Sequence, residues 1–421
     1  MIRLRSRRPS SLPAAAATCG VAVLIAVALL PPVAILDRPS ATRGDVHHYE
    51  SIAKRLGSGA IPYRDFHFEY PPLALVPIAV PALADDYQDA FRLTMLAIAG
   101  LGIAFVAHLV ARLGGGRWRL FVACVGIGLA PLALPVVFFD RLDAWPAVLL
   151  LAGASALVAG RHTLAAGVLA GGTLAKIFPV VGLPAVALDG RRGRRIQSRD
   201  LAVFAGVTGG VLVAFVLVSF SGAAHAASTL VRRPLHIESL GGSALLCLHQ
   251  LGLYDATVYV SFGGSQDLAG PLAAAIAPLQ GVVTAVALVL IWLLFARGER
   301  SVERALTATA ASVVALVAFG KVLSPQFLVW IVFVVPLVER RLFARAVVLT
   351  VAALVLTRAY YPYRYEELIL LGDVAWVMLI RNVVLVVLAL LLIVSLHRPQ
   401  DSAELNAGRA QSGATHATDR G

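Results

Sequence analysis

Long apolar stretches, separated by short polar or charged segments, make up most of the chain. A helix needs roughly 20 apolar residues to cross a bilayer. Stretches that meet or approach this length lie near residues 16–36, 91–111, 119–139, 144–160, 200–220, 271–296, 304–320, 326–338, 343–358 and 374–396. The pattern predicts an all-α fold, a polytopic transmembrane helical bundle.

Two regions do not fit a simple crossing. The run from Pro71 to Ala84 is short and rich in proline, so we expect a re-entrant or surface-lying helix at the outer face. Residues 163–189 have basic residues at both ends, and proline removes a helix donor at Pro179. We therefore expect a hairpin of two short helices there, with Lys176 near its outer turn, and about 10–12 passes in all.

Composition agrees with a membrane protein. Of the 421 residues, 59% are hydrophobic and 14% charged, whereas a soluble domain carries about 25% charged residues. The net charge of +12 does not indicate nucleic-acid binding, because the arginines form short clusters between apolar spans. The basic-aromatic patches of single-strand binders are missing from the sequence.

The arginine clusters predict the topology, because cytoplasmic loops of membrane proteins carry an excess of basic residues. We place the clusters at 3–8, 112–119, 191–199, 297–304 and 340–345 inside, with both termini. Loops 37–90, 221–270 and 359–373 are then outside, and loop 37–90 is expected to contain short amphipathic helices. We expect residues 1–396 to form one transmembrane domain in the inner (plasma) membrane, and residues 397–421 to form a disordered cytoplasmic tail.

The first apolar run is predicted to be a retained helix. It is long enough to cross, and Pro31-Pro32 stands where a signal peptide would have a small-residue cleavage site. A cleaved secretory signal is the alternative. The cysteines, Cys19, Cys124 and Cys247, are scattered and support neither a disulfide framework nor a CxxC metal site. Metal binding by His47, His48 and His67 is an alternative, but His47 and His48 are adjacent and point apart on a helix, so a divalent metal is not the expectation.

Polar side chains concentrate directly after the first apolar run, where their cost next to a bilayer indicates a functional site. Asp45 precedes an amphipathic pattern, so it is either a helix N-cap or a catalytic carboxylate, or both. Asp65, His67 and Glu69 alternate, which would place them on one side of an extended segment. For Asp65 we expect only a solvated loop position, whereas Glu69 adjoins Tyr70-Pro71-Pro72 at the membrane face.

The order of several segments resembles the GT-C membrane glycosyltransferases, most closely the glycosyltransferase family 87 polyprenyl-phosphate-mannose-dependent mannosyltransferases. The segments are Asp45 with Tyr49, Pro62-Tyr63, Tyr70-Pro71-Pro72-Leu73, Asp140-Arg141-Leu142-Asp143, Gly167 through Lys176-Ile177-Phe178-Pro179, Arg233-Pro234-Leu235-His236-Ile237-Glu238-Ser239 and Lys321-Val322-Leu323-Ser324-Pro325-Gln326. They extend over most of residues 40–340.

The resemblance implies transfer of a sugar, mannose in that family, from a polyprenyl-phosphate donor to a hydroxyl of a glycolipid or cell-envelope glycan at the outer face, with inversion. The lipid-linked sugar phosphate is a co-substrate, and no other cofactor is expected. The residues it points to are Asp45 as general base with Glu69 in reserve; Lys176, Lys321, Arg233 and Arg141 at the donor phosphate; and Tyr49, Tyr63, His67, Tyr70, His236, Glu238 and Gln326 at the acceptor and sugar.

Structural alternatives stay open for several of these residues. Lys176 can snorkel to the interface, Arg233 can pair with Glu238, and Asp140, Arg141 and Asp143 can form an ordinary interfacial ion cluster. The group Arg358, Tyr361, Tyr363 and Arg364 is equally typical of an aromatic belt with snorkelling arginines.

Other functions must also be weighed. A transporter or flippase of a lipid-linked or small polar substrate is the main alternative, although such proteins commonly contain an internal repeat and none is visible here. A channel or purely structural membrane protein would leave Asp45, Glu69 and Lys176 unexplained.

Overall fold

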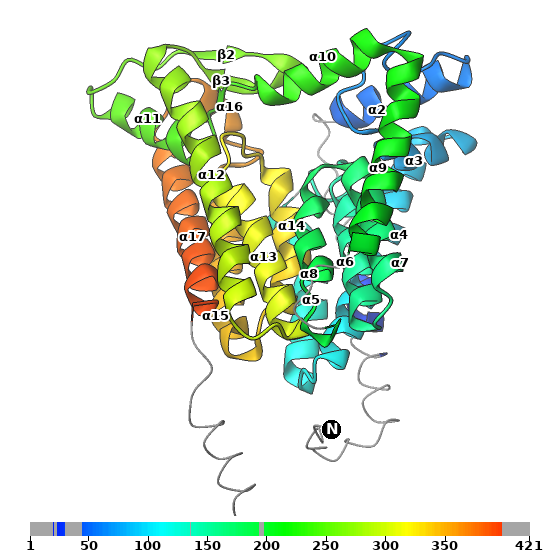
Figure 1. Cartoon of the computed structure of the whole chain (residues 1–421). Helices are drawn as coiled ribbons and strands as arrows, with labels where there is room; N and C mark the ends of the chain where they lie inside the picture. The colour runs from blue at the N-terminus through cyan, green and yellow to red at the C-terminus, as the bar shows by residue number, and fades with distance from the viewer. Residues whose placement is uncertain (1–19, 21–22, 30–43, 135, 193–197, 398–421) are drawn as a thin grey trace, which may run out of the picture.

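The computed structural model describes residues 20, 23–29, 44–134, 136–192 and 198–397. Most of them form upright helices that lie side by side as a bundle (Figure 1). On one side of the bundle these are α4 (Tyr87–Arg112), α5 (Arg117–Ala133), α6 (Ala144–Val158), α7 (His162–Ala175), α8 (Leu183–Ala187) and α9 (Ser198–Val218); on the other they are α12 (Pro271–Arg297), α13 (Val302–Phe319), α14 (Leu328–Val334), α15 (Arg340–Tyr360) and α17 (Val374–Ser395).

Among the described residues, six helices are long and apolar enough to cross a membrane, namely α4, α9, α12, α13, α15 and α17. The chain is therefore a multi-pass membrane protein with an all-α bundle, as the apolar pattern predicted. Helix α13 is the most buried of these six spans, whereas α9 has no buried residue in its apolar window. Helix α13 thus lies inside the bundle and α9 presents its apolar side chains to lipid. The predicted span 16–36 falls largely outside the described residues.

Both irregular regions consist of short helices, as predicted, and their placement at the outer face stays a prediction. Residues 72–83 form three short helical pieces, η1 (Pro72–Ala74), α3 (Leu75–Ala79) and η2 (Val80–Leu83). In the second region, α7 ends at Ala175, and the chain returns through η3 (Phe178–Gly182) and α8. Lys176 lies at the turn in an extended conformation, with φ −160° and ψ 141°. Proline at the second position of η3 prevents α7 from continuing.

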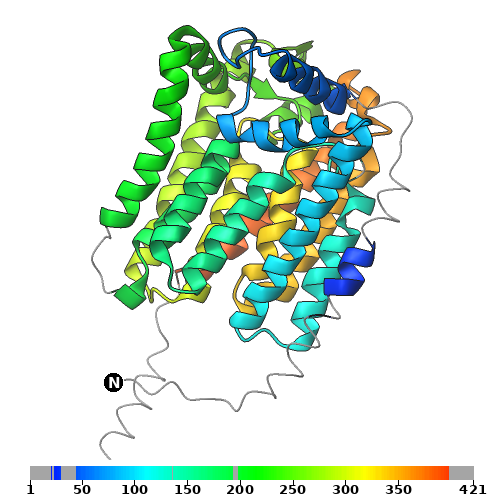
Figure 2. The same ribbon diagram turned by 90° about the vertical axis from the view of Figure 1, so that its right-hand side faces the viewer.

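Shorter elements cover one end of the bundle. They include α2 (Gly44–Gly57), α10 (Phe220–Val231), α11 (Leu240–Gln250) and α16 (Tyr365–Ile369). Figure 2 shows α2 in dark blue across this end, and Figure 1 shows α10 extending from the top of α9 towards the strands. The corner between α9 and α10 is tightly packed, because a Cβ at Gly222 would lie 1.8 Å from the carbonyl oxygen of Tyr63.

The all-α prediction missed a small antiparallel sheet at the same end. Strands β1 (Leu235–His236), β3 (Gln266–Leu268) and β2 (Val258–Val260) lie in the order β1-β3-β2, with Leu268 opposite both Leu235 and Val258. Strands of two or three residues are too short to show a two-residue period, so the sequence pattern could not reveal them.

The opposite end of the bundle carries the arginine clusters. Arg119 donates to the carbonyl oxygens of Pro336, at 3.0 Å, and of Val338. Arg304 donates to the carbonyl of Leu396 at 3.0 Å, and Arg341 to that of Ser395 at 3.3 Å. Cationic side chains at helix C-termini satisfy carbonyls that have no partner within the helix. Basic residues far apart in sequence therefore gather at one end, while the polar segments singled out above gather at the other.

Candidate active site

The turn between α5 and α6 holds three charged residues, and each pairs with a different element. Asp140 accepts two hydrogen bonds from Arg92 of α4, at 2.5 and 2.8 Å. Arg141 forms an ion pair with Asp45 in the first turn of α2. Asp143 pairs with Lys176 at the turn of the α7–α8 hairpin, with 2.6 Å between Nζ and Oδ1. This turn is therefore the point at which three segments distant in sequence are joined.

Exposure separates these three ion pairs. The side chains of Asp140 and Asp143 are 5% and 3% exposed, whereas those of Asp45 and Arg141 are 34% and 25% exposed. A substrate can reach the Asp45–Arg141 pair but not the two buried carboxylates. The ion-cluster interpretation thus suits Asp140 and Asp143, and Asp45 with Arg141 is the candidate catalytic pair.

The surroundings of Asp45 favour a base that can accept a proton. Partial burial raises the pKa of Asp45, Arg141 opposes that effect, and Glu69 adds to it, so that the pKa lies above its ordinary value. Burial by itself would lower the pKa of Arg141, but Asp45 and nearby tyrosines raise it instead. The N-cap interpretation is not supported, because α2 begins at Gly44 and Asp45 lies inside its first turn.

Aromatic side chains surround this pair. The hydroxyl oxygens of Tyr49 and Tyr70 lie 3.5 Å apart, and Tyr49 stacks on Phe91 with a centroid distance of 5.3 Å. The hydroxyl of Tyr63 donates to the carbonyl of Tyr70. Tyr49, Tyr70 and Tyr361 all lie close enough to Arg141 to raise its pKa. The three tyrosines predicted at the acceptor site thus form one connected wall beside Asp45.

The segment 65–69 alternates as predicted. Asp65, His67 and Glu69 are exposed, and Phe66 and Phe68 between them are buried. Asp65 is held by Arg64 and by the backbone N–H of Ile61. His67 packs edge-on against His225 of α10 at 5.0 Å. The carboxylate of Glu69 lies against Gly263, where a Cβ would come within 2.7 Å of Oε2, and is near enough to Asp45 to raise its pKa.

Lys176 has several protein partners. Besides its ion pair with Asp143, its Nζ lies 5.1 Å from the ring centroid of Trp330 and 5.2 Å from that of Phe327. The indole of Trp330 donates to the same carboxylate at 2.7 Å. Gln326 precedes Phe327 in η6 (Pro325–Phe327) and is half-buried. The structure thus gives Lys176 a buried ion pair and aromatic contacts, and its predicted phosphate contact stays a prediction.

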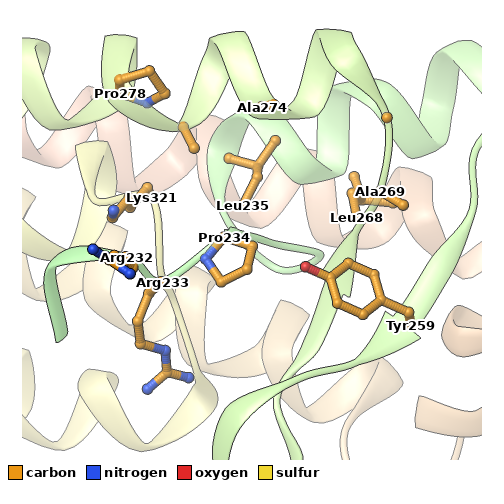
Figure 3. Close-up of a pocket in the computed structure, with 12 residues that line it drawn as sticks. Arg232, Arg233, Pro234, Leu235, Tyr259, Leu268, Ala269, Ala274, Pro278 and Lys321 are labelled. Atoms are coloured by element: carbon orange, nitrogen blue, oxygen red, sulfur yellow. The ribbon is translucent and has the colours of Figure 1, made fainter. Parts of the chain in front are cut away.

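Arg233 and Lys321, by contrast, line a common pocket together with Arg232. The pocket has a volume of about 590 Å³, and its other walls are largely apolar, with Leu235, Ala274 and Pro278 among them (Figure 3). Within the described residues, the Nε of Arg233 is buried without a hydrogen-bond partner. Burial lowers the pKa of Lys321, and Arg233 lowers it further. The pocket is therefore cationic, and no acidic residue lines it.

Glu238 is not the partner of Arg233. It is 1% exposed, accepts a hydrogen bond from the hydroxyl of Tyr360, and pairs with Arg381 of α17 at 3.4 Å. The Arg233–Glu238 alternative is therefore replaced by an Arg381–Glu238 pair. His236 is also buried: desolvation, followed by Arg233 and Arg381, lowers its pKa to about 3, and its Nδ1 accepts from the N–H of Glu238. The backbone N–H of His236 donates to the carbonyl of Lys321 at 3.0 Å, so His236 also holds a residue of the pocket.

The sequence did not predict several residues that pair with these charged side chains. Arg92 and Trp330 lie at the end or in the middle of apolar runs, and nothing local connects them to Asp140 and Asp143. Arg381 did leave a signal, because a lone charge inside the apolar run 374–396 is costly unless it is paired. Within the described ranges, no group of three or more His, Cys, Asp or Glu side chains gathers to hold a metal ion.

Neither a model of a known protein family nor a curated protein matches this chain.

Proposed function

We propose that this protein is an integral membrane glycosyltransferase. It would move a sugar, mannose by the resemblance noted above, from a polyprenyl-phosphate donor to a hydroxyl of a glycolipid or cell-envelope glycan. The observation that carries the proposal is the partly exposed Asp45–Arg141 pair at the end of the bundle where the tyrosines and the cationic pocket also lie. The two carboxylates of the α5–α6 turn, Asp140 and Asp143, are buried in ion pairs, which leaves Asp45 and the exposed Glu69 as accessible carboxylates.

The proposed reaction needs few protein groups. The acceptor oxygen forms a bond to the anomeric carbon, its proton moves to Asp45, and the bond from the anomeric carbon to the donor phosphate breaks with both electrons on the phosphate oxygen. General-base catalysis of this kind contributes roughly 10²–10⁴-fold. The leaving phosphate requires no proton and is stabilised by cations placed where its charge develops. Attack from the face opposite the phosphate inverts the anomeric centre.

The structure contains two sets of cations that suit the phosphate. Arg141 stands beside the proposed base, and Arg233 and Lys321 stand in the pocket. The apolar wall of the pocket belongs partly to α12, whose outward side chains Leu279 and Val282 are exposed as lipid-facing residues would be. A phosphate attached to a long apolar chain fits such a surface better than a soluble nucleotide sugar does. This fit supports a lipid-linked donor.

The test is sugar transfer by the purified protein in lipid, with radiolabelled polyprenyl-phosphate-mannose and a membrane extract as acceptor. Asp45→Asn should lower the transfer rate by about 10²–10⁴-fold while the protein stays folded. The matched control is Asp65→Asn, in the neighbouring loop, which should transfer at the wild-type rate. Undiminished transfer by Asp45→Asn would move the base to Glu69. No transfer by the wild type from any of several lipid-phosphate sugars would reject the proposal in favour of a transporter.

A further inference from the structure

The cationic pocket contains one more polar side chain, which lies opposite the cations. Tyr259 of β2 lines the pocket and is exposed. Figure 3 shows its ring across the pocket from Lys321, with the hydroxyl turned towards Pro234. Among the residues that the structure describes, none forms a hydrogen bond with this hydroxyl. Tyr259 is therefore a polar group of the pocket that a ligand can reach.

Hydrogen bonds fix the cations beside the third turn of α12. The side-chain amide of Gln280 donates to the carbonyls of Phe319 and Gly320, both at 3.2 Å, and Lys321 follows directly in the chain. The backbone N–H of His236 donates to the carbonyl of Lys321 at 3.0 Å. The cationic part of the pocket is therefore held next to Gln280.

Tyr259 lies at the beginning of the same helix. Its strand pairs with β3, and directly after β3 the N–H of Ala269 donates to the carbonyl of Thr257 at 2.9 Å. The next residue, Gly270, is the N-cap of α12. From Gly270 to Gln280 the helix rises about 15 Å, at 1.5 Å per residue. With a volume of about 590 Å³, the pocket accommodates a phosphate and one sugar ring, one after the other along α12.

The order of groups along α12 matches the order of groups in a lipid-linked sugar phosphate. Beyond the cations, Val282, Val286 and Val289 are exposed as lipid-facing residues would be. From its middle to its beginning, the helix thus passes an apolar surface, then the cations, then Tyr259. The lipid has an apolar chain, then a phosphate, then a sugar. Guanidinium groups suit the phosphate, and a tyrosine offers the sugar an apolar ring face and a hydroxyl.

The hairpin that carries Tyr259 also leads towards the proposed base. Gly263, at its tip, lies against the carboxylate of Glu69, where a Cβ would come within 2.7 Å of Oε2. Glu69 precedes Tyr70, which belongs to the tyrosine wall beside Asp45. A sugar at Tyr259 would therefore lie between the phosphate and the side from which the acceptor attacks. Displacement with inversion requires this order.

We propose that Tyr259 contacts the sugar of the lipid-linked donor. The contact makes the pocket prefer a sugar-bearing lipid phosphate to the bare lipid phosphate that remains after transfer. The inference rests on the proposed function in taking a lipid-phosphate sugar as the donor. It adds a specificity-determining residue and a reason for product release, because the contact with Tyr259 is lost once the sugar has moved to the acceptor.

Equilibrium binding separates the sugar contact from the phosphate contact. The purified protein in lipid nanodiscs is titrated with radiolabelled polyprenyl-phosphate-mannose in the absence of an acceptor, and unlabelled polyprenyl phosphate serves as competitor. Tyr259→Phe, which removes only the hydroxyl, should weaken binding of the mannose-bearing lipid about threefold, and Tyr259→Ala, which also removes the ring, about tenfold. One neutral hydrogen bond contributes roughly two- to tenfold. Neither variant should change the affinity for polyprenyl phosphate.

Two further variants serve as comparisons. Arg233→Gln should weaken the binding of both lipids by a similar factor, because both carry the phosphate. Tyr363→Ala should change neither affinity, because Tyr363 is exposed outside the pocket and packs on Arg358.

Equal weakening of both lipids by Tyr259→Ala would show a merely structural role and overturn the proposal, as would unchanged binding of both. A wild type that binds the two lipids equally, or binds neither, would overturn it too. The measurement does not depend on transfer. A preference for the mannose-bearing lipid that depends on Tyr259, in a protein that transfers no sugar to any acceptor, would sustain the contact and reject the proposed function. Sugar transfer without such a preference would do the reverse.

Discussion

At the scale of single residues, the distinction that matters is between charges that are buried in pairs and charges that substrate can reach. Lys176 illustrates the difference. As a lone lysine beside a proline break it resembled a phosphate ligand, yet its side chain is 18% exposed and pairs with the side chain of Asp143, which is 3% exposed. A buried pair stabilises a fold only weakly against an apolar replacement, but removal of one partner leaves an uncompensated charge.

Replacement of Lys176 by methionine should therefore destabilise the protein by about 3–5 kcal/mol, with a smaller loss in the double variant Lys176→Met/Asp143→Leu. Thermal unfolding in detergent micelles measures both. Lys54→Met is the control, because Lys54 is exposed and pairs with Glu50 within one helix. If Lys176→Met instead unfolds like the wild type and only raises the KM for the lipid donor, Lys176 contacts the phosphate after all.

The pocket residues make a separate prediction at the same scale. Arg233→Gln and Lys321→Gln should each raise the KM for the lipid-phosphate donor by about tenfold or more, since hydrogen bonds to charged groups contribute roughly 1.5–3 kcal/mol. Lys321 also donates to the carbonyl of Val231 at 2.8 Å, and glutamine can still make that bond. Arg364→Gln, in an exposed pair with Glu367, serves as control. Equal KM values in all three variants would show that the donor does not bind in this pocket.

At the scale of elements, helix α10 joins the two sides of the covered end. Its start is fixed by the contact of Gly222 with the backbone of Tyr63. Its end is fixed by the hydrogen bond that Lys321 donates to the carbonyl of Val231. Phe215 at the end of α9 packs edge-on against the ring of Tyr63 at 5.3 Å. Helix α10 thus lies against a predicted acceptor residue, Tyr63, at one end and leads into Arg232 and Arg233 of the pocket at the other.

A methyl group at Gly222 should disturb this arrangement. Gly222→Ala places a Cβ 1.8 Å from a carbonyl oxygen, so either α10 or the loop carrying Tyr63 must move. We expect a lower unfolding temperature and reduced transfer. Gly206→Ala in α9 is the matched control, because nothing lies within 4 Å of its Cβ, and alanine in a helix is favoured over glycine by about 0.5–1 kcal/mol. Similar unfolding temperatures for the two variants would contradict the close packing.

The elements also show what the sequence can and cannot predict. Apolar length identified the long helices, and a proline between two basic ends identified the α7–α8 hairpin, because both signals are local. The partners of the charged residues are not local. Arg92 and Asp140 meet only after α4 and α6 have packed, and Arg381 reaches Glu238 across the cap of the bundle. The sequence could place Asp45 and Arg141 in one region. Only the fold shows that their ion pair is partly exposed, whereas the carboxylates of the Arg92–Asp140 and Lys176–Asp143 pairs are buried.

At the scale of the whole molecule, the two ends of the bundle differ in the charged residues that they carry. Arginines tie helix C-termini together at one end, and the Asp45–Arg141 pair, the tyrosines and the pocket lie at the other. Such a division is expected of a protein whose orientation is set by basic loops on the cytoplasmic side. It would also give the proposed lipid-linked donor and acceptor one common side from which to approach.

The orientation itself can be measured by labelling single cysteines. In a background with Cys19, Cys124 and Cys247 replaced by alanine, we expect Asp373→Cys to react with a membrane-impermeant maleimide in intact cells. Arg117→Cys should react only after permeabilisation. Both positions are exposed, and they lie at opposite ends of the bundle, beside α17 and at the start of α5. If only Arg117→Cys reacted in intact cells, the protein would have the opposite orientation to the one expected. Asp45 would then face the cytoplasm, where acceptors of the cell envelope do not lie, and the proposed function would lose the side of the membrane that it requires.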